Sequence, residues 1–214
     1  MGTSGPYNAY VICTSPRSGS TLLCGLLAAT GVAGVPNSHF HVPNRDAWLA
    51  DYGLTKTDYI TEAEQVRAVF EAARSRGTGT TGMFGLRLQR GSFGFLMDQA
   101  KVLLPQAKTD RQRFEAAFGS TLFIHLSRQD KVAQAISRSI AEQSGLWHRA
   151  ADGSELERLA PHRTPQYDGA MIQNHLTELT ALDAAWSVWF KDEGITPLAV
   201  SYEELAGDPS GTLG

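Results

Sequence analysis

The feature that constrains this chain most is an apolar run that breaks into a short polar loop and then continues as a helical pattern. The run is YVICT at residues 10–14, the loop is PRSGS at residues 16–20, and apolar residues recur from Leu22 onward. A glycine-containing loop between a strand and a helix gathers backbone N–H groups and the positive end of the helix dipole around one point. The sequence therefore predicts an anion-binding loop in which Arg17 supplies a full positive charge.

The loop lacks the pattern of a magnesium-nucleotide site. A Walker A loop has a lysine directly after its second glycine and a Ser or Thr that holds Mg²⁺, whereas Ser20 follows Gly19 here. Because the cation precedes the glycine, we expect a phosphosulfate or a metal-free phosphate as the ligand, and no metal. The alternative is a Ser/Gly turn that only caps a structural helix.

Composition limits the class of protein. The chain has 214 residues, 42% of them hydrophobic, enough for one substantial core, so we expect a single domain over residues 1–214. A formal net charge of −3 argues against a nucleic-acid partner, because phosphate contacts need a basic surface. No run approaches the roughly 18 apolar residues of a membrane span, and we expect a cytoplasmic protein. Cys13 and Cys24 lie in apolar settings and are expected to be buried free thiols.

Strand-like apolar runs alternate with helical periodicities, which is typical of an α/β fold with a parallel sheet. We predict strands at residues 10–14, 31–35, 82–88, 121–126 and 198–201. We predict helices at residues 20–29, 61–74, 92–104, 110–118, 130–143 and 168–193, and a further helix that begins near the end. In the helix at 130–143, Val132, Ala135 and Ile136 form the expected packing stripe. Residues 146–164 show no periodicity, and we interpret them as an irregular lid or substrate-side excursion.

A second anion contact is predicted where the strand at 121–126 ends. Arg128 follows that strand, and Ser137 lies nine residues further on, inside the next helix. Ligands of open α/β sheets bind at the carboxyl ends of the strands, and this spacing can bring a guanidinium and a hydroxyl onto one phosphate. The alternatives are a solvated arginine that pairs with Asp130 and an ordinary helix serine.

These motifs resemble the PAPS-dependent sulfotransferases, in the bacterial branch typified by the mycobacterial trehalose sulfotransferase. The resemblance covers most of the chain and rests on segments in the order of the family: SPRSGSTLL, ATGVAGVP, GMFGLRL, FIHLSRQDKVAQAIS, WSVWF and PLAVSYEEL. It implies a three-layer, P-loop-like α/β fold with a central, mainly parallel sheet flanked by helices. The family usually continues through more C-terminal structure, so we expect the domain to be truncated and some nucleotide contacts to lie beyond residue 214.

The resemblance implies transfer of a sulfuryl group from PAPS to a hydroxyl of a small molecule, of carbohydrate or glycolipid type. The residues it assigns to the 5′-phosphosulfate are Arg17, Ser18, Gly19, Ser20, Thr21 and Leu22, and Arg17 also stabilises charge on the leaving group. It assigns the 3′-phosphate to Arg128 and Ser137, and the adenine side to Tyr202, for which a core tyrosine is the alternative. Relatives in this branch form homodimers, which makes a homodimer possible here.

The acceptor side is less defined in the sequence. Arg87 matches a basic residue in the family's G-x-x-G-x-[KR] stretch and either assists the donor site or faces the acceptor, with a surface arginine at a strand end as the alternative. Trp48 is one of several aromatic residues that could line an acceptor pocket, with the core or an interface as the alternative.

The general base departs from the family pattern. The resemblance places a glutamate where this chain has Ser38, and His39 and His41 follow closely. Imidazole is a suitable base at neutral pH, so we predict that one of the two takes this role, with substrate contact or a metal pair as alternatives. Two other functions stay open: a P-loop-type small-molecule kinase, and a PAP- or PAPS-binding protein without transfer activity.

Overall fold

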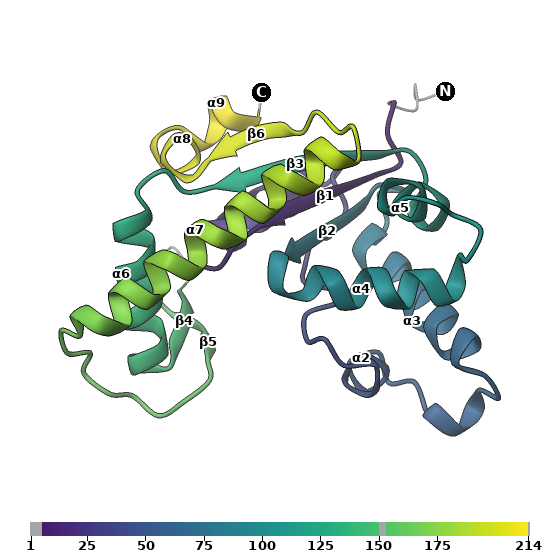
Figure 1. Cartoon of the computed structure of the whole chain (residues 1–214), viewed down its shortest axis with the longest axis horizontal. Coiled ribbons are helices and arrows are strands. Elements are labelled where there is room, and N and C mark those ends of the chain that lie inside the picture. The colour runs from purple at the N-terminus through teal and green to yellow at the C-terminus, as the bar shows by residue number, and fades with distance from the viewer. Residues whose placement is uncertain (1–5, 150–152, 214) are drawn as a thin grey trace.

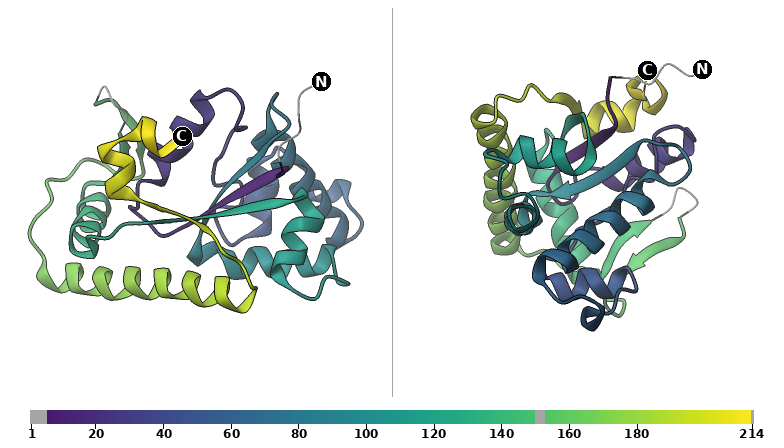
Figure 2. Two further views of the ribbon diagram at one scale, coloured as in Figure 1. Left: turned by 90° about the horizontal axis from the view of Figure 1, so that it is seen from above. Right: turned by 90° about the vertical axis from the view of Figure 1, so that its right-hand side faces the viewer.

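The computed structural model of this chain describes residues 6–149 and 153–213, which form a parallel sheet covered by helices on both faces (Figures 1 and 2). The sheet has the order β2-β1-β3-β6, with strands β1 (Ala9–Thr14), β2 (Phe84–Gln89), β3 (Thr121–Ser127) and β6 (Leu198–Ser201). Every neighbouring pair in this sheet is parallel, so the four carboxyl ends lie along one edge. The expected α/β architecture with a central parallel sheet is confirmed.

Burial on both faces explains why the strands appear as continuous apolar runs. Successive side chains of a strand point to opposite faces: Val11 and Cys13 of β1 face one core, and Tyr10 and Ile12 face the other. The larger core packs against α3 (Glu62–Thr78), α4 (Arg90–Leu103), α5 (Asp110–Phe118) and α7 (Gly169–Asp192). The smaller core packs against α1 (Ser20–Ala29) and α8 (Tyr202–Gly207). Figure 2 shows α7 and α1 on opposite sides of the sheet.

The strand predicted at residues 31–35 is wrong. This segment consists of bends and coil. It contacts the sheet through the hydroxyl of Tyr10, which donates to the Ala33 carbonyl at 2.7 Å, and the only bridge nearby is an isolated one between Asn37 and Leu86. The reason lies in Gly31 and Gly34, whose φ angles of 70° and 72° belong to the left-handed region rather than to an extended strand. The chain then forms α2 (Arg45–Asp51) and the short 3₁₀ helix η1 (Lys56–Asp58), neither of which the sequence predicted.

The irregular excursion expected at residues 146–164 contains regular structure. Strands β4 (Leu146–Arg149) and β5 (Glu155–Arg158) form an antiparallel ribbon, with a register shift on each side of His148. β5 is largely exposed, and a ribbon with little burial lacks the alternation that identifies strands. The ribbon lies against α6 (Lys131–Ser144), where Arg158 Nη1 donates to the carbonyl of Ser144 at 2.7 Å.

The packing stripe expected on α6 is also wrong in two of its three members. Val132 and Ile136 are 51% and 40% exposed, whereas Ala135 is fully buried. The buried face of α6 is instead polar and small, because Gln134 and Ser139 turn inward. Gln134 does so to bind the loop after β1, as described below.

Three further observations concern the whole described chain. α9 (Pro209–Leu213) follows α8, in the place where the sequence predicted the start of a helix. Cys13 and Cys24 are both buried free thiols, as expected. Among the described helices, none combines the length and the apolar character that crossing a membrane requires.

Candidate functional site

The loop between β1 and α1 has an unusual backbone. Gly19 has a φ of 86° and is the N-cap of α1, and Arg17 has a φ of 64°. Arg17 is the only residue other than glycine with a positive φ in the described part of the chain. Such a conformation costs about 1–3 kcal/mol and persists only where surrounding contacts enforce it. Backbone strain of this kind concentrates at ligand-binding positions.

Buried hydrogen bonds from three other elements hold this loop in place. The Ser18 side chain is fully buried and bonds Thr14 Oγ1. Trp186 Nε1 of α7 donates to the Thr14 carbonyl at 2.8 Å, and Gln134 Nε2 of α6 donates to the Pro16 carbonyl at 2.7 Å. The Ser18 hydroxyl, expected on the ligand, therefore faces the interior, and only its main chain is left for an anion.

The Arg17 side chain lies between α6 and the β4–β5 ribbon. Its Nε donates to Ser137 Oγ at 3.0 Å, and its Nη1 donates to the carbonyl of Trp147. The structure thus brings Ser137 to Arg17, whereas the sequence paired Ser137 with Arg128. Burial, followed by the positive charge of Arg128, lowers the pKa of Arg17, while Tyr202 and Glu157 act in the opposite direction. An arginine in this environment gains stability when an anion binds beside it.

Arg128, Tyr202 and Gly19 form a second cluster beside the loop. The Arg128 guanidinium lies over the Tyr202 ring, 4.5 Å from its centroid, a cation–π contact. Gly19 packs against the same ring from the loop. The buried Nε of Arg128 has no hydrogen-bond partner among the described residues. Asp130, the alternative partner of Arg128, instead caps α6 by accepting from the N–H of Ala133 at 2.8 Å.

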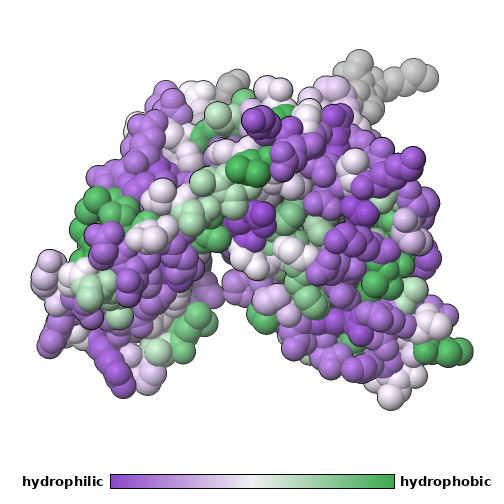
Figure 3. Space-filling view, viewed as in Figure 1, coloured by the Kyte–Doolittle hydropathy of each residue, from purple (hydrophilic) through white to green (hydrophobic). Residues whose placement is uncertain are grey.

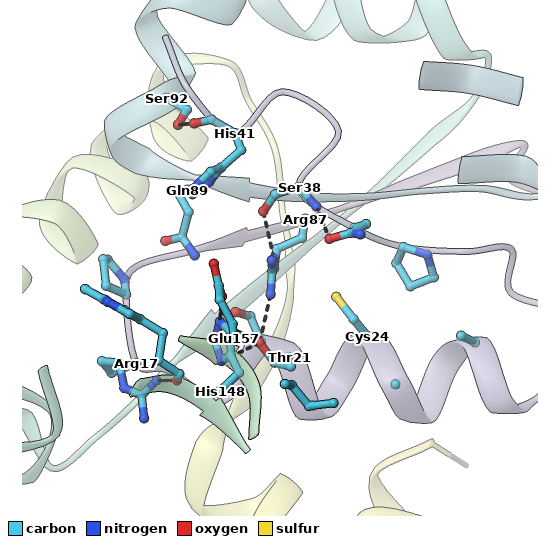
Figure 4. Close-up of a pocket in the computed structure, with 18 of the residues that line it drawn as sticks. Arg17, Thr21, Cys24, Ser38, His41, Arg87, Gln89, Ser92, His148 and Glu157 are labelled. Atoms are coloured by element: carbon cyan, nitrogen blue, oxygen red, sulfur yellow. Dashed lines mark hydrogen bonds and ion pairs between the residues drawn. The ribbon is translucent and has the colours of Figure 1, made fainter. Parts of the chain in front are cut away.

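A cavity of about 880 Å³ opens beside Arg17 (Figure 4). Its walls come from α1, residues 36–41, the end of β2 with the start of α4, and the β4–β5 ribbon. On the face seen in Figure 3, the molecule is hollowed between the part that carries α6 with the ribbon and the part that carries α2 and α4. The predicted residues that line the cavity are Arg17, Ser20, Thr21, His41 and Arg87. Leu22 is 41% exposed and does not line it.

A chain of hydrogen bonds crosses this cavity (Figure 4). Arg87 Nε donates to Ser38 Oγ at 2.8 Å, and its Nη1 donates to Thr21 Oγ1 at 2.9 Å. Thr21 Oγ1 lies 3.1 Å from His148 Nδ1, and His148 Nε2 lies 3.1 Å from Glu157 Oε2. Sequence reasoning missed His148 and Glu157, because the segment that carries them shows no periodic pattern.

The two histidines predicted as bases lie in different environments. His39 is buried, its Nε2 donates to the Val35 carbonyl at 3.1 Å, and it does not line the cavity. Because its ring is buried and faces the interior rather than the cavity, the prediction of His39 as the general base is wrong. Burial also lowers the pKa of His39 to about 4. His41 does line the cavity, and its carbonyl accepts from Ser92 Oγ at 2.6 Å. In the described part of the chain, no three His, Cys, Asp or Glu residues gather as a metal site would require.

The acceptor role predicted for Trp48 is also wrong. Its side chain is 1% exposed and packs edge-on against Phe40 and Phe95, at 5.1 and 5.0 Å between ring centroids. The sequence could not distinguish a core position of Trp48 from a position in an acceptor pocket. The helix α2 was not predicted, and an aromatic side chain suits either a core or a sugar-binding surface.

The charges around the loop are the most specific electrostatic feature of the site. Within residues 6–149 and 153–213, Arg17, Arg87 and Arg128 form no ion pair with a carboxylate. These three arginines therefore place positive charge at the carboxyl edge of the sheet in a protein whose formal net charge is −3. This arrangement suits a ligand with more than one anionic group.

Residues 9–214 match the family model described as Stf0 sulphotransferase. This chain belongs to the Stf0 sulphotransferase family. It is 30% identical over 214 residues to the trehalose 2-sulfotransferase of Mycolicibacterium smegmatis, covering 92% of this chain and 78% of that protein. It is 29% identical over 216 residues to the trehalose 2-sulfotransferase of Mycobacterium tuberculosis, with the same coverage. Among solved structures, the sulfotransferase domain of the Synechococcus PCC 7002 olefin synthase has a TM-score of 0.39 and 18% identity, covering 99% of this chain and 72% of that one.

Proposed function

We propose that this Stf0 family member transfers a sulfuryl group from PAPS to a hydroxyl of a small carbohydrate. The observation that carries the proposal is the set of three arginines, Arg17, Arg87 and Arg128, that surround one strained loop without carboxylate partners in the described chain. PAPS has two separate anionic groups, a 5′-phosphosulfate and a 3′-phosphate. Two groups of unpaired cations on one edge of a parallel sheet fit such a ligand.

The loop is the proposed site of the 5′-phosphosulfate. The main-chain N–H groups of residues 18–22 and the N-terminus of α1 offer donors and a partial positive charge. Arg17 stabilises the charge that develops on the leaving phosphate, and the Ser20 and Thr21 hydroxyls on the cavity side are further donors. Sulfuryl transfer needs alignment and charge stabilisation more than covalent help from the protein.

Arg128 is the proposed ligand of the 3′-phosphate. Its guanidinium is fixed over Tyr202, and its unpartnered Nε supports a role in binding an anion. Ser137 accepts a hydrogen bond from Arg17, so its own hydroxyl hydrogen is left for a phosphate oxygen. Tyr202 holds Arg128 in this position, and its contact with the adenine stays a prediction.

The cavity beside Arg17 is the proposed acceptor site. Its volume of about 880 Å³ suits a small molecule such as a disaccharide. Both mycobacterial relatives are trehalose 2-sulfotransferases, which supports a carbohydrate acceptor and makes trehalose the first one to test. Arg87, from the end of β2, lies where the acceptor cavity meets the loop.

Calorimetric titration of PAP tests the donor site. We expect PAP to bind without Mg²⁺ and more tightly than ADP or ATP, because only PAP carries a 3′-phosphate. Arg128→Ala should weaken the affinity for PAP by about tenfold to hundredfold, which is the contribution of one charged hydrogen bond, and leave the affinity for ADP little changed. Arg163→Ala is the control, since Arg163 is an exposed arginine outside the site. Equal affinity for PAP and ADP would overturn the donor assignment.

Transfer of radiolabelled sulfate from PAPS to trehalose, glucose and glycerol tests the acceptor class. We expect the label on trehalose and little on glycerol, because a small triol cannot fill the cavity. PAP binding without label on any of these acceptors would contradict a carbohydrate acceptor and favour a binding protein without transfer activity.

A further inference from the structure

We propose that His148, oriented by Glu157, is the general base that removes the proton from the acceptor hydroxyl. The inference rests on the sulfuryl transfer proposed above and assigns its proton acceptor to the β4–β5 ribbon. Neither residue stood out in the sequence, and both line the acceptor cavity.

The direction of each hydrogen bond in the cavity follows from the chemistry of its two ends. An arginine only donates, so Thr21 Oγ1 accepts from Arg87 Nη1 at 2.9 Å. A carboxylate only accepts, so the 3.1 Å contact between His148 Nε2 and Glu157 Oε2 assigns the proton of a neutral ring to Nε2. Nδ1 of a neutral His148 therefore carries the lone pair. The Thr21 hydroxyl lies 3.1 Å from Nδ1 and 3.3 Å from Nε2, and in this tautomer it donates to Nδ1. This tautomer places a basic nitrogen inside the cavity.

The position of that nitrogen fits proton removal during transfer. Thr21 lies in the first turn of α1, directly after the loop proposed to bind the phosphosulfate, while His148 and Glu157 lie beside it on the β4–β5 ribbon (Figure 4). Nδ1 thus lies where the donor loop meets the acceptor cavity. An acceptor hydroxyl that replaces the Thr21 hydroxyl as donor to Nδ1 would lie next to the sulfuryl group that the loop presents.

The charges that face His148 keep it available as a base. Burial lowers the pKa of His148, Glu157 opposes this effect, and the positive charges of Arg87, Arg17 and His41 lower the pKa further. His148 is therefore neutral near pH 7, where a base must hold no proton. Glu157 stabilises the imidazolium that forms and fixes the ring orientation, as the third member of a catalytic triad does.

The proposed step balances in atoms and charge. The acceptor O–H bond breaks and its proton moves to His148 Nδ1. The acceptor oxygen forms a bond to sulfur, and the bond from sulfur to the phosphate oxygen breaks, with its electron pair left on the phosphate beside Arg17. The imidazolium of His148 later releases its proton to water.

His41 is the competing base, since it also lines the cavity. In the described residues, however, His41 has no carboxylate partner, whereas His148 is paired with Glu157. Without an orienting acceptor, the ring of His41 is not fixed in one tautomer. Geometry therefore favours His148.

Enzyme kinetics on four variants tests the assignment, with the acceptor that the sugar panel identifies. We expect His148→Ala to reduce turnover by about 10²–10⁴-fold, with partial recovery in added imidazole and with PAP affinity unchanged. Glu157→Gln should lower turnover less and move the acidic limb of the pH profile to lower pH, because loss of the negative charge lowers the pKa of His148. His41→Ala changes the lining of the acceptor cavity, so it should raise KM more than it lowers kcat and should show no rescue by imidazole. Exposed His162→Ala is the control.

Nuclear magnetic resonance of the histidine rings tests the same inference without an acceptor. In the PAP-bound protein we expect His148 to be neutral near pH 7 and protonated on Nε2. A charged ring, or a proton on Nδ1, would overturn the proposal, as would full turnover in His148→Ala. Failure of wild-type PAP binding would instead overturn the proposed sulfuryl transfer, so the two failures are distinguishable.

Discussion

Gly19 packs so closely against Tyr202 that a Cβ on Gly19 would lie 2.5 Å from Cδ2 of the ring. The contact joins the anion-binding loop to the junction of β6 and α8, and the Arg128 guanidinium lies over the same ring. The Tyr202 ring therefore lies between the loop proposed for the 5′-phosphosulfate and the Arg128 guanidinium proposed for the 3′-phosphate. A change in the contact between Gly19 and Tyr202 should alter the binding of a ligand that spans both positions.

Gly19→Ala tests this relationship. The substitution adds a clash with Tyr202 to the strain of a φ of 86°, and we expect a loss of about 1–3 kcal/mol in stability and at least about tenfold in PAP affinity. Gly31→Ala is the matched control: Gly31 has a φ of 70°, but a Cβ added there would meet nothing within 4 Å, so this variant should lose about 1 kcal/mol of stability and keep its affinity. Denaturant unfolding and PAP titration measure both quantities, and equal affinity losses would refute the role of the contact.

Trp186 offers a second test, because its indole holds the end of β1. Trp186→Phe leaves the buried Thr14 carbonyl without the 2.8 Å bond from Nε1, and we expect a loss of about 1–3 kcal/mol in stability together with weaker PAP binding. Trp189→Phe removes a comparable bond to Asp110 Oδ2 at 3.2 Å, away from the loop. It should reduce stability alone. If both variants bind PAP as the wild type does, the Trp186 bond does not support the loop.

The parts of the fold that the sequence predicted are those with local signals. The strand at residues 10–14, the helix from Ser20 and the position of Arg17 follow from adjacent residues, because an apolar run, a glycine loop and a helical repeat are short-range patterns. The partners of Arg17 do not follow, since Ser137 and Trp147 lie far along the chain. The sequence carries no information on these long-range contacts, and the spacing between Arg128 and Ser137 led to the prediction that they act as a pair.

The sequence-based prediction of the acceptor-site residues was wrong for a different reason. His148 and Glu157 lie on a short, partly buried ribbon whose strands carry no alternation, so no sequence pattern indicates that they meet. His39 and His41 were equivalent in the sequence, and only the hydrogen bond of His39 to the Val35 carbonyl and its burial separate them. Single aromatic or histidine residues outside a predicted element cannot be assigned to a core or a site by pattern.

His39 also makes stability depend on pH. Burial lowers its pKa from 6.5 to about 4, so the unfolded chain binds a proton in a range where the folded one does not. The stabilisation is complete above about pH 6.5, falls as the pH drops toward 4, and amounts to about 3 kcal/mol in all. His39→Gln should therefore lose less stability than the wild type between about pH 7 and pH 5 in urea unfolding. The exposed His162→Gln should follow the wild type, and an unchanged pH dependence in His39→Gln would contradict the burial argument.

Thr21 connects Arg87 to His148, and a pair of substitutions separates its hydroxyl from its shape. Thr21→Val keeps the volume but removes the oxygen that accepts from Arg87 at 2.9 Å and donates to His148 at 3.1 Å. Thr21→Ser keeps that oxygen and loses a methyl group. We expect kcat in Thr21→Val to fall by about 10–10²-fold, as for one lost catalytic hydrogen bond, and to fall much less in Thr21→Ser. His148 Nδ1 loses its hydrogen-bond partner in Thr21→Val but not in Thr21→Ser. The pH profile of kcat should therefore shift in Thr21→Val and stay unchanged in Thr21→Ser. Equal losses in the two variants would show that packing of the methyl group, rather than the hydroxyl, is what the site requires.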